Sequence, residues 1–413
     1  MNVISYTCYI TKIHTKAILN YTKKLFVKRM EVRTIENKFI LKTKVYFNNQ
    51  SLQSLKQITG TRAFIVSDSI MNNFGYLQEV IGYLDEAGIA SVVFSGVRPD
   101  PDVSVIADGL KLYRECEADV LVALGGGSAI DTAKGFLYFE WKLGSVESTE
   151  IKKPLFIAIP STSGTGSEVT DFSVITSEHE KVCIIDEFIA PDIAILDSTC
   201  IQHLPGRVVV DTGIDVLVHA TEAYLSTKAT DFTDALAEKA IKLIFENLET
   251  LYKDIKNTPA RDRVLNASCL AGMAFSNAGL GINHSLAHAL GGTFHISHGR
   301  SNALFFDAVI EYNAELSGSV NSYAAERYAK LATVLQLPSR TRREGAVNFM
   351  LAIKKLKREL KVEGNIRALG VSQTEFDNAL GHMAETALLD RCTPTNPRQP
   401  SKEDLIQIFK KCY

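Results

Sequence analysis

The hydrophobic pattern of the chain changes about halfway along it. Between residues 40 and 200, short apolar runs end in polar or glycine-rich turns, and segments with helical spacing lie between them. Runs that are apolar on both faces are typical of buried parallel strands, and strands that alternate with helices form an open α/β domain. The runs are RAFIVSDS (62–69), ASVVFSG (90–96), DVLVALGGGS (119–128), PLFIAIPSTSGTGSE (154–168) and DIAILDS (192–198), with helices expected at 71–87 and 103–117.

From residue 207 onward the pattern is helical, with almost no strand signal. Asp231 is the candidate N-cap of a long helix, because its side chain can accept from the free N–H groups of a first turn. Helices are expected at 231–255, 322–336, 343–360 and 373–388. We therefore expect three parts, namely an N-terminal extension at 1–38, an α/β domain at 39–205 and an all-α domain at 206–413.

The N-terminal extension differs from both domains in charge. Its first thirty residues carry six lysine and arginine side chains and no acidic one, and residues 13–27 are compatible with a basic amphipathic helix. Three interpretations stay open: a targeting or encapsulation peptide, a disordered tail, or translation that starts at Met30. A secretory signal peptide is disfavoured, because no apolar core of sufficient length is present.

Composition indicates a soluble, globular, cytoplasmic protein. Apolar residues make up 46% of the chain and the mean hydropathy is +0.03. The net charge of −2 gives no electrostatic basis for binding nucleic acid or a membrane surface, and no apolar stretch is long enough to span a bilayer. The seven cysteines are scattered and form no CxxC pair. This usage fits a reducing compartment and argues against disulfides or a thiolate metal site.

Two polar loops follow neighbouring predicted strands and point to a nucleotide. LVALGGGSAIDTAKG (121–135) predicts a strand, a glycine turn and a helix start, where the backbone can approach a phosphate and Ser128 can cap the helix. PSTSGTGSE (160–168) adds hydroxyl groups at the next strand end. Alone, the first loop also fits an ordinary strand-to-helix turn, since it lacks the GxGxxG spacing. Together, the loops predict a crevice of the kind in which open α/β sheets bind ligands.

Asp68 ends an earlier predicted strand. A carboxylate at that position can accept a hydrogen bond from a ribose 2′-OH and repel a 2′-phosphate, which would favour NAD over NADP. An aspartate in a surface turn is the other interpretation. The sequence alone leaves both open.

The second half contains residues that could bind a metal ion. Asp215 and His219 lie four residues apart, on one face of a largely apolar predicted helix. One carboxylate and three imidazoles would suit Fe²⁺ or Zn²⁺ with a position left for substrate. The alternative is a set of hydrogen-bonded core histidines, although each unpaired buried imidazole costs free energy. Spacing alone does not select the ligands among four clustered histidines: His284, His288, His295 and His298.

With these residues in view, the chain resembles the iron-containing (group III) alcohol dehydrogenases from about residue 40 to the C-terminus. Three further segments are most similar to the 1-propanol dehydrogenases of propanediol-utilisation microcompartments, and ethanol and butanol dehydrogenases are near neighbours. The family motifs are GGGSAIDTAKG, PSTSGTGSEVT, ILDSTCIQHLP, DTGIDVLVHATEAYLS and GLGINHSLAHALGGTFHISHGRSNAL, and the further segments are DFTDALAEKA, NASCLAGMAFSNAGLG and TNPRQPS. The family pattern does not account for residues 1–38.

The resemblance implies an α/β NAD-binding domain followed by a helical metal-binding domain, the dehydroquinate synthase-like architecture. It places His288 near the nicotinamide as a candidate proton-relay group, and His295 matches no ligand position. The implied ligands of Fe²⁺, or alternatively Zn²⁺, are Asp215, His219, His284 and His298. The implied cofactor-contacting residues are Asp68, Asp100, Gly126, Gly127, Ser128, Asp131, Ser161, Thr162, Thr165 and Lys181, the last in a region where the sequence is shortened.

The resemblance further implies a metal- and NAD(H)-dependent enzyme that reduces a short aldehyde, with propionaldehyde to 1-propanol as the leading reaction, and regenerates NAD⁺. Ethanol, butanol or glycerol dehydrogenase and transhydrogenase chemistry are the alternatives on this fold. We expect a homodimer or larger homo-oligomer, and a bacterial microcompartment with a shell or enzyme partner as a setting. A non-catalytic scaffold that docks through its basic extension is the rival of a different class, which a complete ligand set disfavours.

Overall fold

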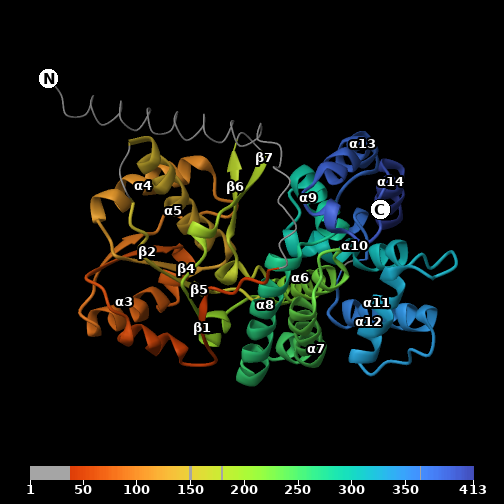
Figure 1. Ribbon diagram of the computed structural model, residues 1–413, viewed down its shortest axis with the longest axis horizontal. Helices are drawn as coiled ribbons and strands as arrows, with labels where there is room; N and C mark the ends of the chain where they lie inside the picture. Colours follow the sequence, from red (N-terminus) through yellow and green to blue (C-terminus); the bar gives the residue numbers. More distant parts are fainter. Residues whose placement is uncertain (1–37, 148–150, 178–179, 363) are drawn as a thin grey trace. The chain divides into compact units, whose positions relative to one another are not determined.

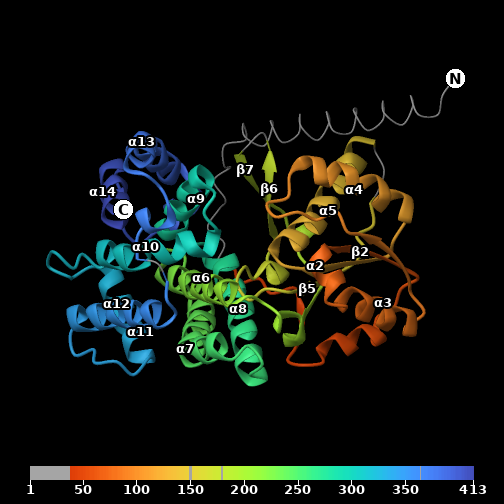
Figure 2. The same cartoon turned by 180° about the vertical axis from the view of Figure 1, so that it is seen from behind.

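The computed structural model describes residues 38–147, 151–177, 180–362 and 364–413, and these ranges divide into two compact units (Figures 1 and 2). The first unit ends at Cys200, a few residues before the expected domain boundary. The second unit runs from Ile201 to Tyr413 and also includes Ser163–Gly166. Residues 1–37 of the basic extension lie outside the described residues. Within these residues, no helix has both the length and the apolar content needed to cross a bilayer.

A six-stranded parallel sheet forms the centre of the first unit, with strand order β1-β8-β5-β4-β2-β3. Strands β4 and β5 are buried along almost their whole length, as their apolar sequences predict. Side chains of β2 alternate between two cores, with Phe64 in one and Ile65 in the other. The bounds are β1 (Lys44–Phe47), β2 (Arg62–Ser67), β3 (Ala90–Phe94), β4 (Val120–Gly125), β5 (Leu155–Pro160) and β8 (Ile193–Leu196).

Helices cover both faces of this sheet, which confirms the predicted α/β class. Residues of α4 and α5 fill one core, and residues of η1, α2 and α3 fill the other. Figure 1 shows α4 and α5 on one side of the sheet and α3 on the other. The single helix expected at 71–87 is wrong, because Gly75 adopts a left-handed φ of 83° that separates two helices. The bounds are η1 (Ser51–Gln57), α2 (Ser69–Asn73), α3 (Tyr76–Glu86), α4 (Val103–Cys116) and α5 (Gly127–Glu147).

An antiparallel hairpin, β6 (Phe172–Ser177) and β7 (Glu180–Ile185), follows the second polar loop and was not predicted from the sequence. The buried ammonium of Lys134 on α5 anchors the segment that leads into it. This group donates hydrogen bonds to the carbonyl oxygen of Ser167 at 2.6 Å and to that of Phe172 at 2.8 Å. Burial lowers the pKa of Lys134 to about 8, although nearby carboxylates oppose the shift. Hydrogen bonds from Lys134 on α5 therefore fix the end of the loop that follows β5.

The second unit is all-α, as predicted. The helix expected at 231–255 begins at Asp231, but Thr230 is its N-cap and forms a capping box with Thr233, so the assignment of Asp231 as the cap is wrong. Apolar residues of α9, α10, α13 and α14 pack into one core. The bounds are α6 (Gly206–Leu225), α7 (Asp231–Lys253), α8 (Thr258–Ala278), α9 (Ile282–Phe294), α10 (His298–Asn313), α11 (Tyr323–Val334), α12 (Arg342–Glu359), α13 (Gln373–Leu389) and α14 (Lys402–Cys412).

Helix α6 is the most deeply buried element of this unit. Every residue from Val209 to Leu225 except Thr212 is buried, as expected of a helix that is apolar on most of its surface. Four ionisable side chains interrupt this surface at spacings of four, four and three residues: Asp211, Asp215, His219 and Glu222. Residues at these spacings lie on one face of a helix. We call this set the α6 stripe.

Candidate metal centre

The second unit brings four ionisable side chains into one group. Asp215 and His219 come from α6, His284 from the first turn of α9 and His298 from the start of α10. One oxygen or nitrogen atom from each lies within 4.8 Å of the others. The first three are buried, and the side chain of His298 is 37% exposed. These are the four residues that the family motifs single out, and we call them the four-donor group.

The turn between α9 and α10 brings the two later histidines together. Helix α9 ends at Phe294, and His295 follows in a left-handed conformation with a φ of 55°. Helix α10 then begins at His298, so its ring returns to within 5.3 Å of the His284 ring, measured between centroids. His295 therefore serves to turn the chain, and it does not belong to the four-donor group.

Burial leaves two nitrogen atoms of this group without a hydrogen-bond partner: Nδ1 of His219 and Nε2 of His284. Burial also raises the pKa of Asp215 to about 8 and lowers the pKa of His219 to about 3. Unpaired buried polar atoms are costly, and a divalent cation would satisfy both nitrogens and favour the ionised carboxylate. One oxygen and three nitrogen donors match the preferences of Fe²⁺ and Zn²⁺. The residues present therefore fit such an ion.

Two polar side chains that sequence reasoning missed contact this group. Asn302 donates a hydrogen bond from Nδ2 to Asp215 Oδ1 at 2.7 Å. The same Nδ2 atom of Asn302 lies 3.1 Å from His298 Nε2. Glu222 on α6 places Oε2 at 2.5 Å from His284 Nδ1. Burial raises the pKa of Glu222 to about 8, while backbone N–H groups act in the opposite direction. Both residues have a sequence signal, since Asn302 lies four positions after His298 and Glu222 lies three after His219.

His288 lies one turn beyond His284 on α9 and borders the group without belonging to it. Its ring centroid is 5.3 Å from that of His298, and its side chain is 34% exposed. Asp390, just after α13, places Oδ2 at 2.9 Å from His288 Nδ1. Although burial opposes ionisation, the hydrogen bond from His288 holds the pKa of Asp390 well below its usual range. No local sequence pattern connects residues 288 and 390.

In the first unit, several expected cofactor residues gather at the carboxyl ends of neighbouring strands β2, β4 and β5. The N–H of Ser161 donates to the carbonyl of Gly125 at 2.9 Å, which places the two polar loops side by side. Helix α5 begins at Gly127, so Ser128 lies inside its first turn and the expectation that it caps the helix is wrong. The residues brought to this edge are Asp68, Gly126, Gly127, Ser128, Ser161 and Thr162.

Asp68 is the N-cap residue of helix α2. Its Oδ1 accepts hydrogen bonds from the N–H groups of Ile70 and Met71 and so caps α2. Its Oδ2 lies 3.2 Å from the point that a Cβ on Gly125 would occupy. One carboxylate oxygen therefore faces the glycine turn while the other holds the helix.

The remaining expected cofactor residues have different environments. The Asp131 carboxylate accepts from Ser167 Oγ at 2.9 Å and from the N–H of Val174 at 3.3 Å, so it supports the second loop and the hairpin. Asp100 adopts a left-handed φ of 50° before α4. Thr165 belongs to the second unit, and Lys181 lies on β7 with its side chain outside the described part of the structure.

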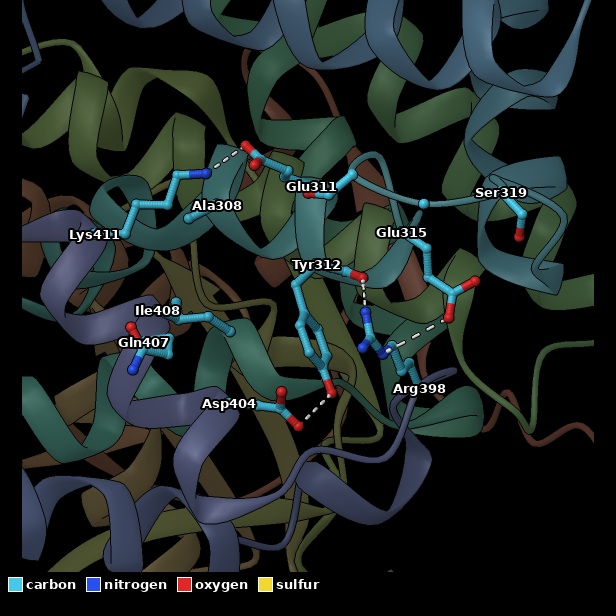
Figure 3. Close-up of a pocket in the computed structure, with 12 residues that line it drawn as sticks. Ala308, Glu311, Tyr312, Glu315, Ser319, Arg398, Asp404, Gln407, Ile408 and Lys411 are labelled. Carbon is cyan, nitrogen blue, oxygen red and sulfur yellow. Dashed lines mark hydrogen bonds and ion pairs between the residues drawn. The ribbon is translucent and has the colours of Figure 1, made fainter.

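A separate hollow of about 530 Å³ lies between the C-terminal end of α10 and α14 (Figure 3). Three acidic and two basic side chains line it, and several of them contact one another. Lys411 lies 2.5 Å from Glu311, and the Arg398 guanidinium stacks 4.0 Å above the Tyr312 ring. None of its lining residues belongs to the four-donor group. We therefore place the candidate site at the four-donor group and not in this hollow.

Comparison with known proteins agrees with this geometry. The model of the iron-containing alcohol dehydrogenases matches residues 42–198, and that of the C-terminal part of the Fe-containing alcohol dehydrogenase family matches residues 209–413. An NADPH-dependent butanol dehydrogenase from Clostridium saccharobutylicum is 39% identical over 91% of this chain and 98% of that protein. The 1-propanol dehydrogenase PduQ from Citrobacter freundii is 38% identical over 90% and 99%. The chain spans about half the length (45%) of the aldehyde-alcohol dehydrogenases from Streptococcus pneumoniae that it also matches.

Comparison with solved structures finds the same family. An iron-containing alcohol dehydrogenase from Thermococcus thioreducens has a TM-score of 0.83 and 35% sequence identity, covering 91% of this chain and 99% of that one. The predicted architecture, an α/β unit followed by a helical unit, is thereby confirmed. The chain belongs to the iron-containing alcohol dehydrogenase family, oxidoreductases whose cofactors are iron and NAD(H).

Proposed function

We propose that this chain reduces short-chain aldehydes to primary alcohols with NADH, and that propionaldehyde to 1-propanol is its leading reaction. The four-donor group, with two buried nitrogens that lack partners, is the observation that carries the proposal. The likeness to a 1-propanol dehydrogenase and a butanol dehydrogenase supports a short, unbranched substrate. The two relatives differ in the alcohol that they are named for, so butanal and acetaldehyde are the next candidates.

We assign Asp215, His219, His284 and His298 as ligands of Fe²⁺, with Zn²⁺ as the alternative. When bound, the metal polarises a substrate carbonyl, and the reduced nicotinamide supplies the hydride. The chain's own part is to hold three imidazoles and one carboxylate in a buried group, where water competes weakly for the donors. The partly exposed His298 marks the side from which a substrate can enter.

His288 is the proposed relay for the proton that the substrate oxygen gains as the carbonyl is reduced. Its Nδ1 faces Asp390, so the neutral ring carries its proton on Nδ1 and exchanges the catalytic proton at Nε2. Asp390 fixes this tautomer and stabilises the charged ring once Nε2 is protonated. The partial exposure of His288 lets the proton be replaced from solvent. His288 is thus the proton carrier and Asp390 its positioning residue.

The glycine turn of the first unit is the proposed pyrophosphate site. Its backbone opens directly into α5, whose N-terminal end favours an anion. The Oδ2 of Asp68 next to this turn is the proposed acceptor for a ribose hydroxyl. Ser161, Thr162 and Thr165 are proposed to donate further hydrogen bonds to the cofactor. The neighbouring residue Asp131 acts by holding the loop that presents these hydroxyls.

A bacterial microcompartment is the proposed setting, supported by the likeness to the 1-propanol dehydrogenases PduQ from Citrobacter freundii and Salmonella typhimurium. The basic residues of the N-terminal extension are the candidate contact with a shell or enzyme partner, and a homodimer or larger homo-oligomer is the expected assembly. Glycerol dehydrogenase and transhydrogenase chemistry stay as alternatives on the same fold. Turnover with free NADH and an aldehyde, without a second substrate, distinguishes the proposed reaction from a transhydrogenase.

The direct test follows NADH oxidation at 340 nm with propionaldehyde. The enzyme is stripped with a chelator and then reconstituted separately with Fe²⁺ and with Zn²⁺. We expect turnover to return with at least one of the two ions and to favour aldehydes of two to four carbons over glyceraldehyde. No turnover with either ion across this series would reject the proposed reaction.

Replacement of His284 tests the ligand assignment. His284→Ala is expected to weaken metal binding by about 100-fold or more, because one donor is lost and the remaining donors stay buried. The quantity measured is metal content after dialysis against a weak chelator. His382→Ala, at an exposed position of α13, is the matched control and should keep its metal. A His284→Ala protein with full metal content would contradict the assignment.

Replacement of Asp68 tests cofactor selection. Asp68→Asn keeps an N-cap for α2 but removes the charge. We expect the ratio of kcat/KM for NADPH to that for NADH to rise about tenfold, the equivalent of ~1.4 kcal/mol of relieved repulsion. Asp102→Asn, at the N-cap of α4, is the matched control. An unchanged ratio in the Asp68 variant would leave Asp68 with its structural role alone.

Replacement of Asp390 tests the proton path. In Asp390→Asn the amide can donate to His288 Nδ1 and so favour the wrong tautomer, and we expect kcat to fall about 100-fold with metal content unchanged. Asp377→Asn, at an exposed position of α13, is the control. A kcat within twofold of the unmodified enzyme would exclude this pair from proton transfer.

A further inference from the structure

We infer that Glu222 is a positioning residue for the metal centre: it holds His284 in the tautomer that presents Nε2 as a donor, and it also closes the N-terminal end of α9. The inference depends on the ligand role proposed for His284. Its test measures metal affinity, so it does not depend on which aldehyde the enzyme reduces.

The position of Glu222 follows from the spacing of the α6 stripe. It lies three residues after His219 and seven after Asp215, on the face of the helix that carries both proposed ligands. Glu222 is 6% exposed, so its carboxylate cannot rely on solvent for its hydrogen bonds. A carboxylate buried to this extent needs protein donors on both oxygens.

Each oxygen of Glu222 has a donor from α9. Oε2 lies 2.5 Å from Nδ1 of His284, and Oε1 accepts from the N–H of Asn283 at 2.6 Å. The backbone N–H groups of Gly281 and His284 also bond to this carboxylate. A metal ligand at Nε2 needs the lone pair of that nitrogen, which leaves the ring proton on Nδ1, where Glu222 Oε2 is placed to accept it.

The two nitrogens of His284 therefore have opposite surroundings. Nδ1 faces the Glu222 carboxylate, whereas Nε2 makes no hydrogen bond and lies 3.8 Å from Asp215 Oδ1 within the four-donor group. With the proton held on Nδ1, a neutral imidazole has its lone pair on Nε2. A carboxylate behind a ligating histidine also raises the basicity of the ring. Glu222 thus makes Nε2 a better donor.

The start of α9 depends on the same carboxylate. Gly281 is the N-cap residue and has no side chain with which to cap the helix. Glu222 accepts a hydrogen bond from the N–H of Asn283, and Asn396 Oδ1 accepts one from the N–H of Ile282 at 3.2 Å. A Cβ at position 281 would lie 2.8 Å from oxygen atoms of both caps, so only glycine fits there. A residue outside the helix therefore fixes both the helix end and the ligand on its first turn.

The test measures metal dissociation constants by chelator competition on the full chain, with Fe²⁺ and Zn²⁺. Glu222→Gln keeps the shape of the side chain, but its amide can donate to Nδ1 and favour the tautomer with the proton on Nε2. We expect metal to bind 10- to 100-fold more weakly. Glu222→Asp retains the charge and should recover part of this loss. Glu246→Gln, at an exposed position of α7, should bind as the unmodified protein does.

Asn396→Ala separates the two roles of Glu222. It removes a cap from α9 but leaves the Glu222–His284 contact in place. Near-normal affinity in Asn396→Ala together with a loss of at least tenfold in Glu222→Gln would support the inference. It would be overturned by a Glu222→Gln affinity within twofold of normal, by equal losses in the two variants, or by no recovery in Glu222→Asp. If His284→Ala bound metal normally, the proposed ligand set would fail; if only turnover were absent, the proposed reaction would fail.

Discussion

The cost of burying polar groups in an apolar helix governs the arrangement of the helical unit. Helix α6 is buried along almost its whole length, yet it carries the four ionisable side chains of the α6 stripe. Each of these needs a partner, since an unpaired buried charge is far more costly than a lost surface contact. Helices α9 and α10 supply partners for three of them through His284, Asn302 and Arg300, the last at 2.6 Å from Asp211.

The two units present different kinds of polar groups. The first offers mainly backbone and hydroxyl groups at the ends of parallel strands, where a charged cofactor can be held by many weak contacts. The second offers a compact set of side-chain donors in a low-dielectric environment, where a few contacts are each strong. The loop after β5 contributes Thr162 to the first unit and Thr165 to the second. The buried ammonium of Lys134 anchors the segment just beyond it.

Sequence spacing predicted the features that depend on near neighbours. Apolar runs located the strands β2 to β5 and β8, and the four-residue spacing of Asp215 and His219 placed them on one helix face. The break at Gly75 and the cap at Thr230 were missed because a φ value and a capping bond are decided by packing as much as by residue type. Asp390 could not have been found, because its contact with His288 joins positions 102 residues apart. Glu222 was visible in the helical spacing, but only the structure shows its partner.

A metal ion bound by the proposed ligands would also stabilise the folded chain. A ligand that binds only the folded chain stabilises it by mass action, by about 2.7 kcal/mol when its free concentration is a hundred times its dissociation constant. A chain without the metal would lack this contribution and would spend more time unfolded, where proteases can cut it. The residues proposed to bind the catalytic metal would therefore also make the lifetime of the folded chain depend on metal binding.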